Sequence, residues 1–90
     1  MKVFLTSKFA KQLKRLHPAE KKIMDKAVQK IIDNPKIGEA KIGDLIGVYI
    51  YKFKVKDQQW LMAYEIISNK SLKLLMFGPH ENFYQKLKYI

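Results

Sequence analysis

Cysteine is absent from the 90-residue sequence, and arginine occurs only once, as Arg15. The lack of cysteine excludes a disulfide framework and a thiolate metal site, and it suits a reducing compartment. Two histidines far apart in the sequence do not supply the three or four ligands of a zinc site. No stretch approaches the roughly 20 apolar residues of a membrane span, and the first residues, 1–6, contain too short an apolar run for a signal peptide. We therefore expect a cytoplasmic protein with no metal, no cofactor and no membrane contact.

Lysine and apolar residues make up much of what is present. An apolar content of 48% with 12% aromatic residues indicates a folded chain, and 90 residues suit a single domain spanning 1–90. Eighteen Lys and Arg residues against eight Asp and Glu residues give a net charge of +10. A charge of this size attracts polyanions such as RNA, DNA or an acidic protein, although a solvated lysine-rich surface is the plainer interpretation.

The first third of the chain has the pattern of a strand followed by two helices. Residues 2–6 predict the strand, and Thr6 or Ser7 is placed to cap the first helix. The His17-Pro18 pair separates the helices, because a residue before proline disfavours the helical conformation. The second helix has a broad apolar face at helical spacing, formed by Ile23, Met24, Ala27, Val28, Ile31 and Ile32.

Residues 34–47 are predicted to form a loop, because proline and glycine interrupt the pattern. We expect this loop to pack on the domain through Ile37, Ile42 and Leu45. Alternation then predicts a strand over 48–56, a turn at 57–59 and a strand over 60–67.

The chain ends with a near-continuous apolar strand over 72–77, a Gly78-Pro79 break and a short helix within 82–89. The order of elements is therefore β-α-α-β-β-β-α. It predicts an α+β fold in which a helical hairpin packs on a small, mainly antiparallel four-stranded sheet, followed by a short C-terminal helix.

One strand face and one corner carry the residues that suit chemistry on RNA. Lys52, Lys54 and Lys56 alternate along the strand at about 7 Å spacing, which suits phosphate binding. His80 follows the last strand, and histidine is the side-chain type that exchanges protons near neutral pH. Tyr84 lies one helical turn later and could stack on a base or assist proton transfer. A solvated lysine face and a histidine in a capped turn are the plainer alternatives.

These residue types fit metal-independent RNA cleavage, in which the 2′-hydroxyl of the RNA is the nucleophile. Such a reaction needs a base, an acid and cations, and it needs no nucleophile from the protein. Glu65 is a candidate for the second acid–base residue, although it could instead pair with a strand lysine. Asp57 and Glu81 are further candidates.

Three segments resemble the RelE/ParE superfamily, which contains toxins of bacterial type II toxin–antitoxin systems. These segments are Gly43–Tyr49, Trp60–Ile66 and the ending Gly78–Tyr84. The resemblance is greatest to the YafQ-like and RelE-like branches, and it implies a ribosome-dependent endoribonuclease that cuts mRNA and inhibits translation. It also implies an acidic antitoxin that neutralises the toxin, with operator DNA bound only through that antitoxin.

By the same resemblance, His80 matches the YafQ-like histidine, Tyr84 a functional aromatic residue, and Lys52 and Lys54 the paired strand lysines of RelE-like members. The sequence departs from the family where RelE-like toxins carry strand arginines and where YafQ-like toxins carry a further His and Asp. The residues found there are Leu61, Ala63, Leu74, Met76, Val55 and Gln59. Two alternatives stay open: a ParE-like inhibitor of DNA gyrase, and an attenuated toxin fold that only binds its partners.

Overall fold

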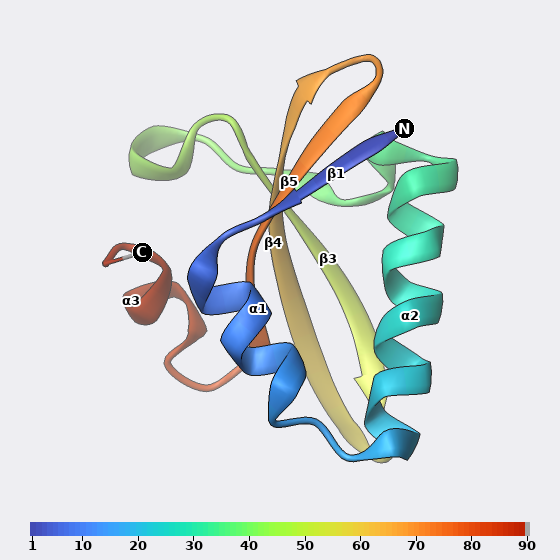
Figure 1. The fold of residues 1–90 in the computed structure, drawn as a ribbon. Coiled ribbons are helices and arrows are strands. Elements are labelled where there is room, and N and C mark those ends of the chain that lie inside the picture. The colour runs from blue at the N-terminus through green and yellow to red at the C-terminus, as the bar shows by residue number, and fades with distance from the viewer. Residues whose placement is uncertain (90) are drawn as a thin grey trace.

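The computed structural model describes residues 1–89 and has the predicted α+β fold. A helical hairpin follows the first strand, and a meander of strands leads into a short final helix (Figure 1). The helices are α1 (Ser7–Lys14), α2 (Pro18–Asp33) and α3 (Phe83–Leu87), with short 3₁₀ turns η1 (Pro35–Ile37) and η2 (Gly43–Leu45). The strands are β1 (Lys2–Leu5), β2 (Glu39–Ala40), β3 (Val48–Val55), β4 (Gln58–Ser68) and β5 (Ser71–Pro79).

The strands form one five-stranded sheet in the order β1-β5-β4-β3-β2. Only β1 and β5 are parallel; the other pairs are antiparallel, as predicted. The prediction of four strands missed β2, which consists of two residues inside the segment 34–47 that was expected to be a loop. A strand of two residues is too short to show the alternation of apolar and polar residues from which strands are predicted.

Thr6 fixes the passage from the first strand into the helical hairpin. Its hydroxyl accepts a hydrogen bond from the Phe9 N–H (3.0 Å), which caps α1 as predicted, and donates one to the Leu75 carbonyl (2.6 Å). At the next junction His17 precedes Pro18, the first residue of α2, and the His17 N–H donates to the Glu20 carboxylate (3.0 Å). Both helix starts therefore lie where the sequence predicts them.

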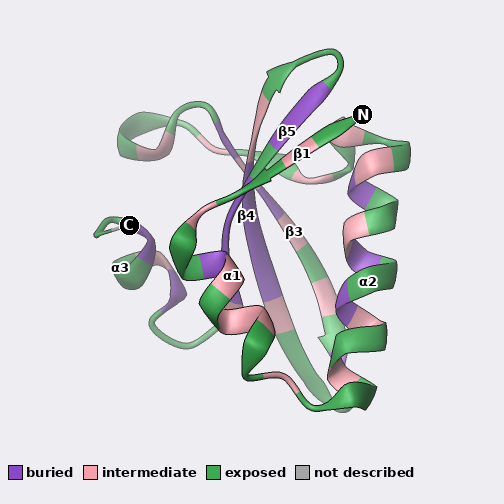
Figure 2. Cartoon of the chain, viewed as in Figure 1, coloured by how far each residue is buried: buried purple, intermediate pink, exposed green. Residues whose placement is uncertain are grey.

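The sheet separates two apolar cores (Figure 2). The first lies beneath α1 and α2, where Phe9, Met24 and Ile31 are fully buried against the sheet. The second lies on the opposite face, where Phe83 and Leu87 of α3 cover side chains of β3, β4 and β5. An irregularity at Leu75 turns two consecutive residues of β5 toward this second core, because one extra residue in a strand changes which side chains share a face.

Several details differ from the predictions. Leu45 packs on the second core, but Ile42 is 86% exposed and Ile37 is 40% exposed, so the expectation that all three anchor the loop is wrong. The hairpin turn lies at Lys56-Asp57, where Lys56 has a positive φ of 58°, rather than at 57–59. Within residues 1–89, no helix is both long and apolar enough to cross a membrane.

Candidate functional site

The candidate site lies on the face of the sheet that α3 only partly covers. Val48 and Ile50 of β3 are buried in the second core, and the same face continues along the strand to Lys52 and Lys54. Both lysines are exposed. The second half of β3 therefore presents two cations beside an apolar core.

His80 lies at the end of the sheet, in line with one of these lysines. Its N–H donates to the Gln59 carbonyl (3.4 Å), and Gln59 is the cross-strand partner of Lys54. Because neighbouring strands are about 4.8 Å apart, the backbones of His80 and Lys54 lie roughly 10 Å from each other across β4. A phosphate group with its flanking sugars can span such a distance.

Tyr84 contacts His80 from the first turn of α3. The two ring centroids are 6.2 Å apart at an interplanar angle of 83°. This is the edge-to-face arrangement that aromatic pairs favour. The His80 carbonyl accepts a hydrogen bond from the Phe83 N–H (3.2 Å), so the corner leads directly into α3. The sequence predicted this pair from spacing alone, and the structure brings its members together.

Two further charged residues belong to this site, and neither was predicted from the sequence. Glu39 pairs with Ile50 across β2 and β3, so its side chain lies on the face that also carries Lys52. Lys41 follows two residues later, where its N–H donates to the Val48 carbonyl (2.9 Å). The short strand β2 and the residue that follows it therefore add one carboxylate and one ammonium group to the site.

Lys41 connects the carboxylate to the aromatic pair. Its Nζ lies 2.5 Å from the Glu39 Oε1 and 5.2 Å from the centroid of the Tyr84 ring. The second distance is within the range of a cation–π contact. Glu39, Lys41, Tyr84 and His80 thus form a continuous series of contacts between the β2 edge and the end of β5. Among residues 1–89, Lys41–Glu39 is the single salt bridge.

These contacts shift the proton affinity of both charged groups. The hydrogen bond from Lys41, with its charge, lowers the pKa of Glu39, and the charge of Lys52 adds a smaller lowering effect. The hydrogen bond with Glu39 raises the pKa of Lys41, and Tyr84 contributes in the same direction. Glu39 is therefore an ionised proton acceptor at neutral pH, and Lys41 is a cation.

Glu65, predicted as a partner for His80, is placed elsewhere. It pairs with Lys73 and Val48 at the far end of β4. Glu65 is six positions beyond Gln59, which corresponds to about 20 Å along a strand. At that end of the sheet Glu65 lines a separate hollow of about 270 Å³ beside Leu87. The structure therefore does not bring Glu65 together with His80.

The other predicted residues also lie outside the site. Lys56 is in the β3–β4 turn with a positive φ, so it does not extend the row of Lys52 and Lys54 along the strand face. Asp57 shares that turn, and Glu81 lines a pocket between α1 and α3.

Most positions at which the sequence departs from the family pattern are buried, whereas Gln59 is exposed. Leu61 and Ala63 are 0% exposed, Leu74 is 1% exposed and Met76 is 2% exposed. Their apolar character has a packing reason, since an arginine there would need a buried partner. In the part of the chain that the structure describes, no three His, Asp or Glu side chains lie close enough together to hold a metal ion.

Comparison with known proteins gives a family and a fold. A family model described as "ParE-like toxin of type II bacterial toxin-antitoxin system" matches residues 3–88. No curated protein matches the chain.

Solved structures of an E. coli toxin have the same fold. The intact E. coli RelBE toxin–antitoxin complex contains a chain with a TM-score of 0.69 and 17% identity, covering 89% of this chain and 96% of that one. A mutant of E. coli toxin RelE in the free state gives a TM-score of 0.71 at 16% identity, covering 97% of this chain and 90% of that one. A RelE mutant in complex with an antitoxin RelBc peptide gives 0.67 at 16% identity, covering 99% and 93%. At these identities the likeness concerns the fold.

Proposed function

The chain belongs to the ParE-like toxin family of type II bacterial toxin–antitoxin systems, and on that premise we propose that it is an endoribonuclease that cleaves mRNA on the ribosome. Cleavage uses the 2′-hydroxyl of the RNA as the nucleophile and requires no metal ion. The consequence for the cell is inhibition of translation.

One observation carries this proposal: four separate elements contribute to one polar surface. The β2 edge supplies Glu39 and Lys41, β3 supplies Lys52 and Lys54, the corner after β5 supplies His80, and α3 supplies Tyr84. A carboxylate, an imidazole and three ammonium groups are the set that this reaction needs. Structural packing alone gives no reason to gather them on one exposed face.

The acid and the base have opposite tasks. The Glu39 carboxylate takes the proton of the 2′-hydroxyl, and the 2′-oxygen then attacks phosphorus. The bond from phosphorus to the 5′-oxygen breaks, and His80 in its imidazolium form gives its proton to that oxygen. The products are a 2′,3′-cyclic phosphate and a 5′-hydroxyl end.

The remaining residues hold the substrate. Lys52 and Lys54 stabilise the extra negative charge on phosphorus, and Lys41 offers a further cation once a phosphate competes with Glu39 for it. The exposed part of the Tyr84 ring offers a surface on which a base can stack, and stacking suits unpaired RNA in particular.

The proposed protein partner is an acidic antitoxin. The chain has a net charge of +10, which favours an acidic partner, and one of the solved relatives is E. coli RelE bound to an antitoxin RelBc peptide. Operator DNA would then be bound only through that antitoxin. Neutralisation would follow if the antitoxin covers the surface around His80.

The test is brief expression of the free toxin, followed by mapping of the mRNA ends. We expect new 5′-hydroxyl ends inside translated codons and arrest of growth, both lost in His80→Ala. The matched control is His17→Ala, which replaces the other histidine at the start of α2 and should leave cleavage intact. Full cleavage by His80→Ala would disprove the role of His80.

The same experiment separates the gyrase alternative. An inhibitor of DNA gyrase would induce the DNA-damage response and leave mRNA intact. An attenuated toxin would do neither and would still bind its antitoxin.

A further inference from the structure

A pocket adjoins the corner at Pro79–Glu81, which carries His80. It has a volume of about 460 Å³ and lies between α1, the end of β5 and α3. Pro79 and Glu81, the two neighbours of His80, form part of its wall. The corner that presents His80 to the candidate site therefore has this pocket behind it.

The pocket combines an apolar floor with polar groups around its rim. Met76, Phe77 and Phe83 form the floor. Gln58 and Asn82 also line the pocket, and their side-chain amides carry hydrogen-bond donors and acceptors. The Gln58 Oε1 accepts a hydrogen bond from the Trp60 Nε1–H (3.3 Å). Lys8 of α1 and Lys86 of α3 add cations.

Asn82 has an unusual backbone for a residue with a side chain. It lies in the left-handed region with φ at 59°, and its side chain makes no capping bond to α3 although it occupies the N-cap position. Asparagine adopts this conformation more readily than most other non-glycine residues. Asn82 is one of the residues that line the pocket.

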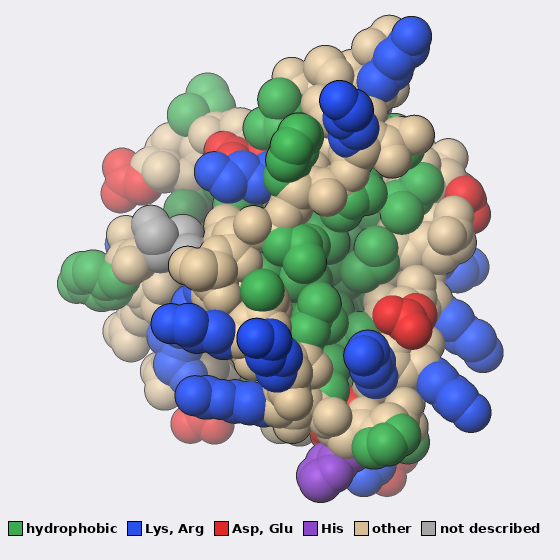
Figure 3. All heavy atoms as spheres, in the orientation of Figure 1, with side chains coloured by type: hydrophobic (Ala, Val, Ile, Leu, Met, Phe, Trp, Pro, Cys, Tyr) green, Lys and Arg blue, Asp and Glu red, His purple; other side chains and the backbone are tan. Residues whose placement is uncertain are grey.

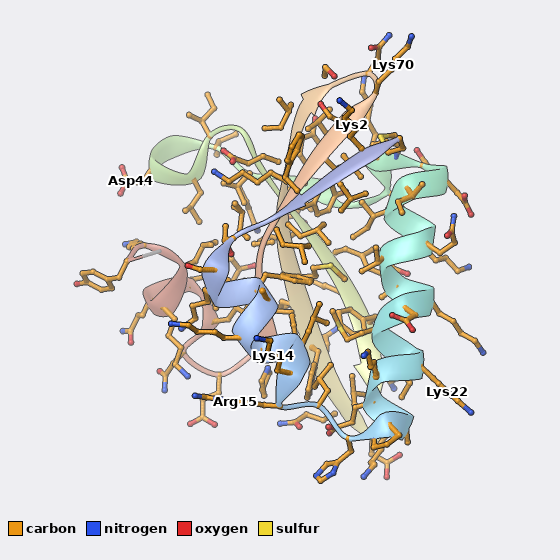
Figure 4. The ribbon with its side chains drawn as sticks, in the orientation of Figure 1. Lys2, Lys14, Arg15, Lys22, Asp44 and Lys70 are labelled. Carbon is orange, nitrogen blue, oxygen red and sulfur yellow. The ribbon has the colours of Figure 1, made fainter. Side chains whose placement is uncertain are left out.

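A basic surface continues from the pocket along α1. A neighbouring hollow of about 290 Å³ shares Lys8 and Gln12 with the pocket, and it adds Lys11 and the one arginine of the chain, Arg15. Figure 3 shows basic side chains gathered over α1 and toward α3, and Figure 4 shows Arg15 just beyond the end of α1. Cations in a row beside a pocket suit a chain of phosphates leading away from it.

We propose that this pocket holds one nucleotide of single-stranded RNA next to the scissile phosphate, and that the strand continues along α1. The inference rests on the proposed endoribonuclease function, since it extends the same RNA beyond the corner. The amides of Gln58 and Asn82 contact the edge of the base, while Lys8 and Lys86 bind the adjoining phosphates. Single-stranded RNA fits this arrangement because its bases are free to leave the stack and be bound by their edges.

The binding test uses an RNA that cannot be cut. A fluorescent oligonucleotide of about ten nucleotides with 2′-O-methyl groups at every sugar lacks the attacking hydroxyl, so its affinity reports binding alone. Lys86→Gln should weaken binding. It should also make the fall of log affinity with log salt less steep by about 0.7, the value for one lost phosphate contact on a single strand. Lys88→Gln removes the same charge from the same end of the chain at a residue outside the pocket, and it should leave that slope unchanged.

The base contact has its own variant. Asn82→Gly keeps the left-handed backbone, because glycine adopts it without strain, and removes the side chain with its amide. We expect binding to fall roughly fivefold, the equivalent of one net hydrogen bond. In labelled wild-type protein, the side-chain amide signals of Gln58 and Asn82 should shift when the oligonucleotide is added.

The outcomes separate this inference from the proposed function. Equal effects of Lys86→Gln and Lys88→Gln, with no shift at Gln58 or Asn82, would overturn the pocket assignment, even if mRNA is cut. The absence of any binding to the wild type would overturn it too, and would favour an acidic protein segment as the occupant. If the wild type binds through the pocket but cuts no mRNA, the pocket stands and the catalytic proposal fails.

Discussion

The hydroxyl of Tyr64 accepts a hydrogen bond from the Gly38 N–H at 3.0 Å and donates one to the Pro35 carbonyl at 2.6 Å. Tyr64 lies at the centre of the sheet and is 0% exposed, whereas Gly38 directly precedes Glu39. A side chain in the core thus holds the segment that carries the candidate base. The position of Glu39 depends on a contact between residues that are 26 positions apart.

Tyr64→Phe should therefore destabilise the fold and displace the site. The variant leaves the Pro35 carbonyl and the Gly38 N–H without their partner, which costs roughly 1–3 kcal/mol for buried groups. Urea unfolding measures this loss, and mRNA cleavage should fall along with it. Tyr89→Phe is the control, because Tyr89 is 90% exposed and its hydroxyl should not matter. Equal stabilities of the two variants would contradict the role of this contact.

Stability should also decline in alkali through Tyr64. Burial raises the pKa of Tyr64 above its ordinary value of 10.0, against a smaller lowering by the Gly38 hydrogen bond. A group with a raised folded-state pKa contributes its full stability below the unfolded value and loses it as the pH rises through the folded value. The difference in unfolding free energy between wild type and Tyr64→Phe should therefore shrink above about pH 10. A difference that stays constant across this range would refute the assignment.

Gly38→Ala tests the same contact from the other side. A Cβ at Gly38 would lie 2.6 Å from the Tyr64 hydroxyl oxygen and 3.0 Å from the Ile50 carbonyl oxygen, so the chain must shift. Overpacking of this kind costs roughly 1–3 kcal/mol. The cost should be smaller in a Tyr64→Phe background, because the nearest clashing atom is gone. Strictly additive effects in this double-mutant cycle would show that the two residues do not interact.

Gln12 closes the edge of β5 beyond the end of β1. Its amide donates to the Phe77 carbonyl (2.6 Å) and accepts from the Phe77 N–H (3.0 Å), so one side chain replaces a missing strand partner. Gln12→Ala should cost about 1–3 kcal/mol, since two backbone groups lose their partner. Gln29→Ala is a matched control, because Gln29 bonds only to the exposed Asp33 side chain. Thermal unfolding of the two variants would then give clearly different midpoints.

Glu39→Gln should impair the reaction without affecting the fold. The amide keeps the shape but cannot take a proton, so cleavage should fall about 10²–10⁴-fold, the usual contribution of a positioned base. The free energy of unfolding should barely change, as for surface substitutions in general. Asp44→Asn removes the same charge from the η2 turn, where Figure 4 shows Asp44 projecting outward, and it should cleave normally. Unimpaired cleavage by Glu39→Gln would exclude Glu39 as the base.

The activity of the wild type should also persist in mild acid. The cations around Glu39 lower its pKa below 4.5, so this carboxylate stays ionised at a lower pH than an ordinary glutamate. If activity falls on acidification while the pH is still above about 5, another group must be responsible, because even an ordinary glutamate is ionised there. Comparing the cleavage rates of wild type and Glu39→Gln across pH would reveal whether Glu39 controls the acidic or the alkaline limb of the profile.

Local patterns along the chain were enough to predict most elements and half of the site. Period and capping residues predict the helices that begin after Thr6 and at Pro18, because local hydrogen bonds and side-chain alternation decide them. The Gly78-Pro79-His80 corner and Tyr84 were also predictable, because a short turn at 81–82 keeps residues four apart in sequence close in space. The strand lysines Lys52 and Lys54 followed from alternation.

The position of the remaining charged residues depends on contacts between distant parts of the chain. Glu39 and Lys41 reach the site through a two-residue strand, and that strand is held by Tyr64 from the middle of the sheet. Glu65 had the right chemistry, but strand register pairs it with Lys73 at the other end of β4. That end is about 20 Å from the corner, given the rise per residue of a strand. Pairing across strands joins residues distant in sequence, and a single sequence contains no period that reports it.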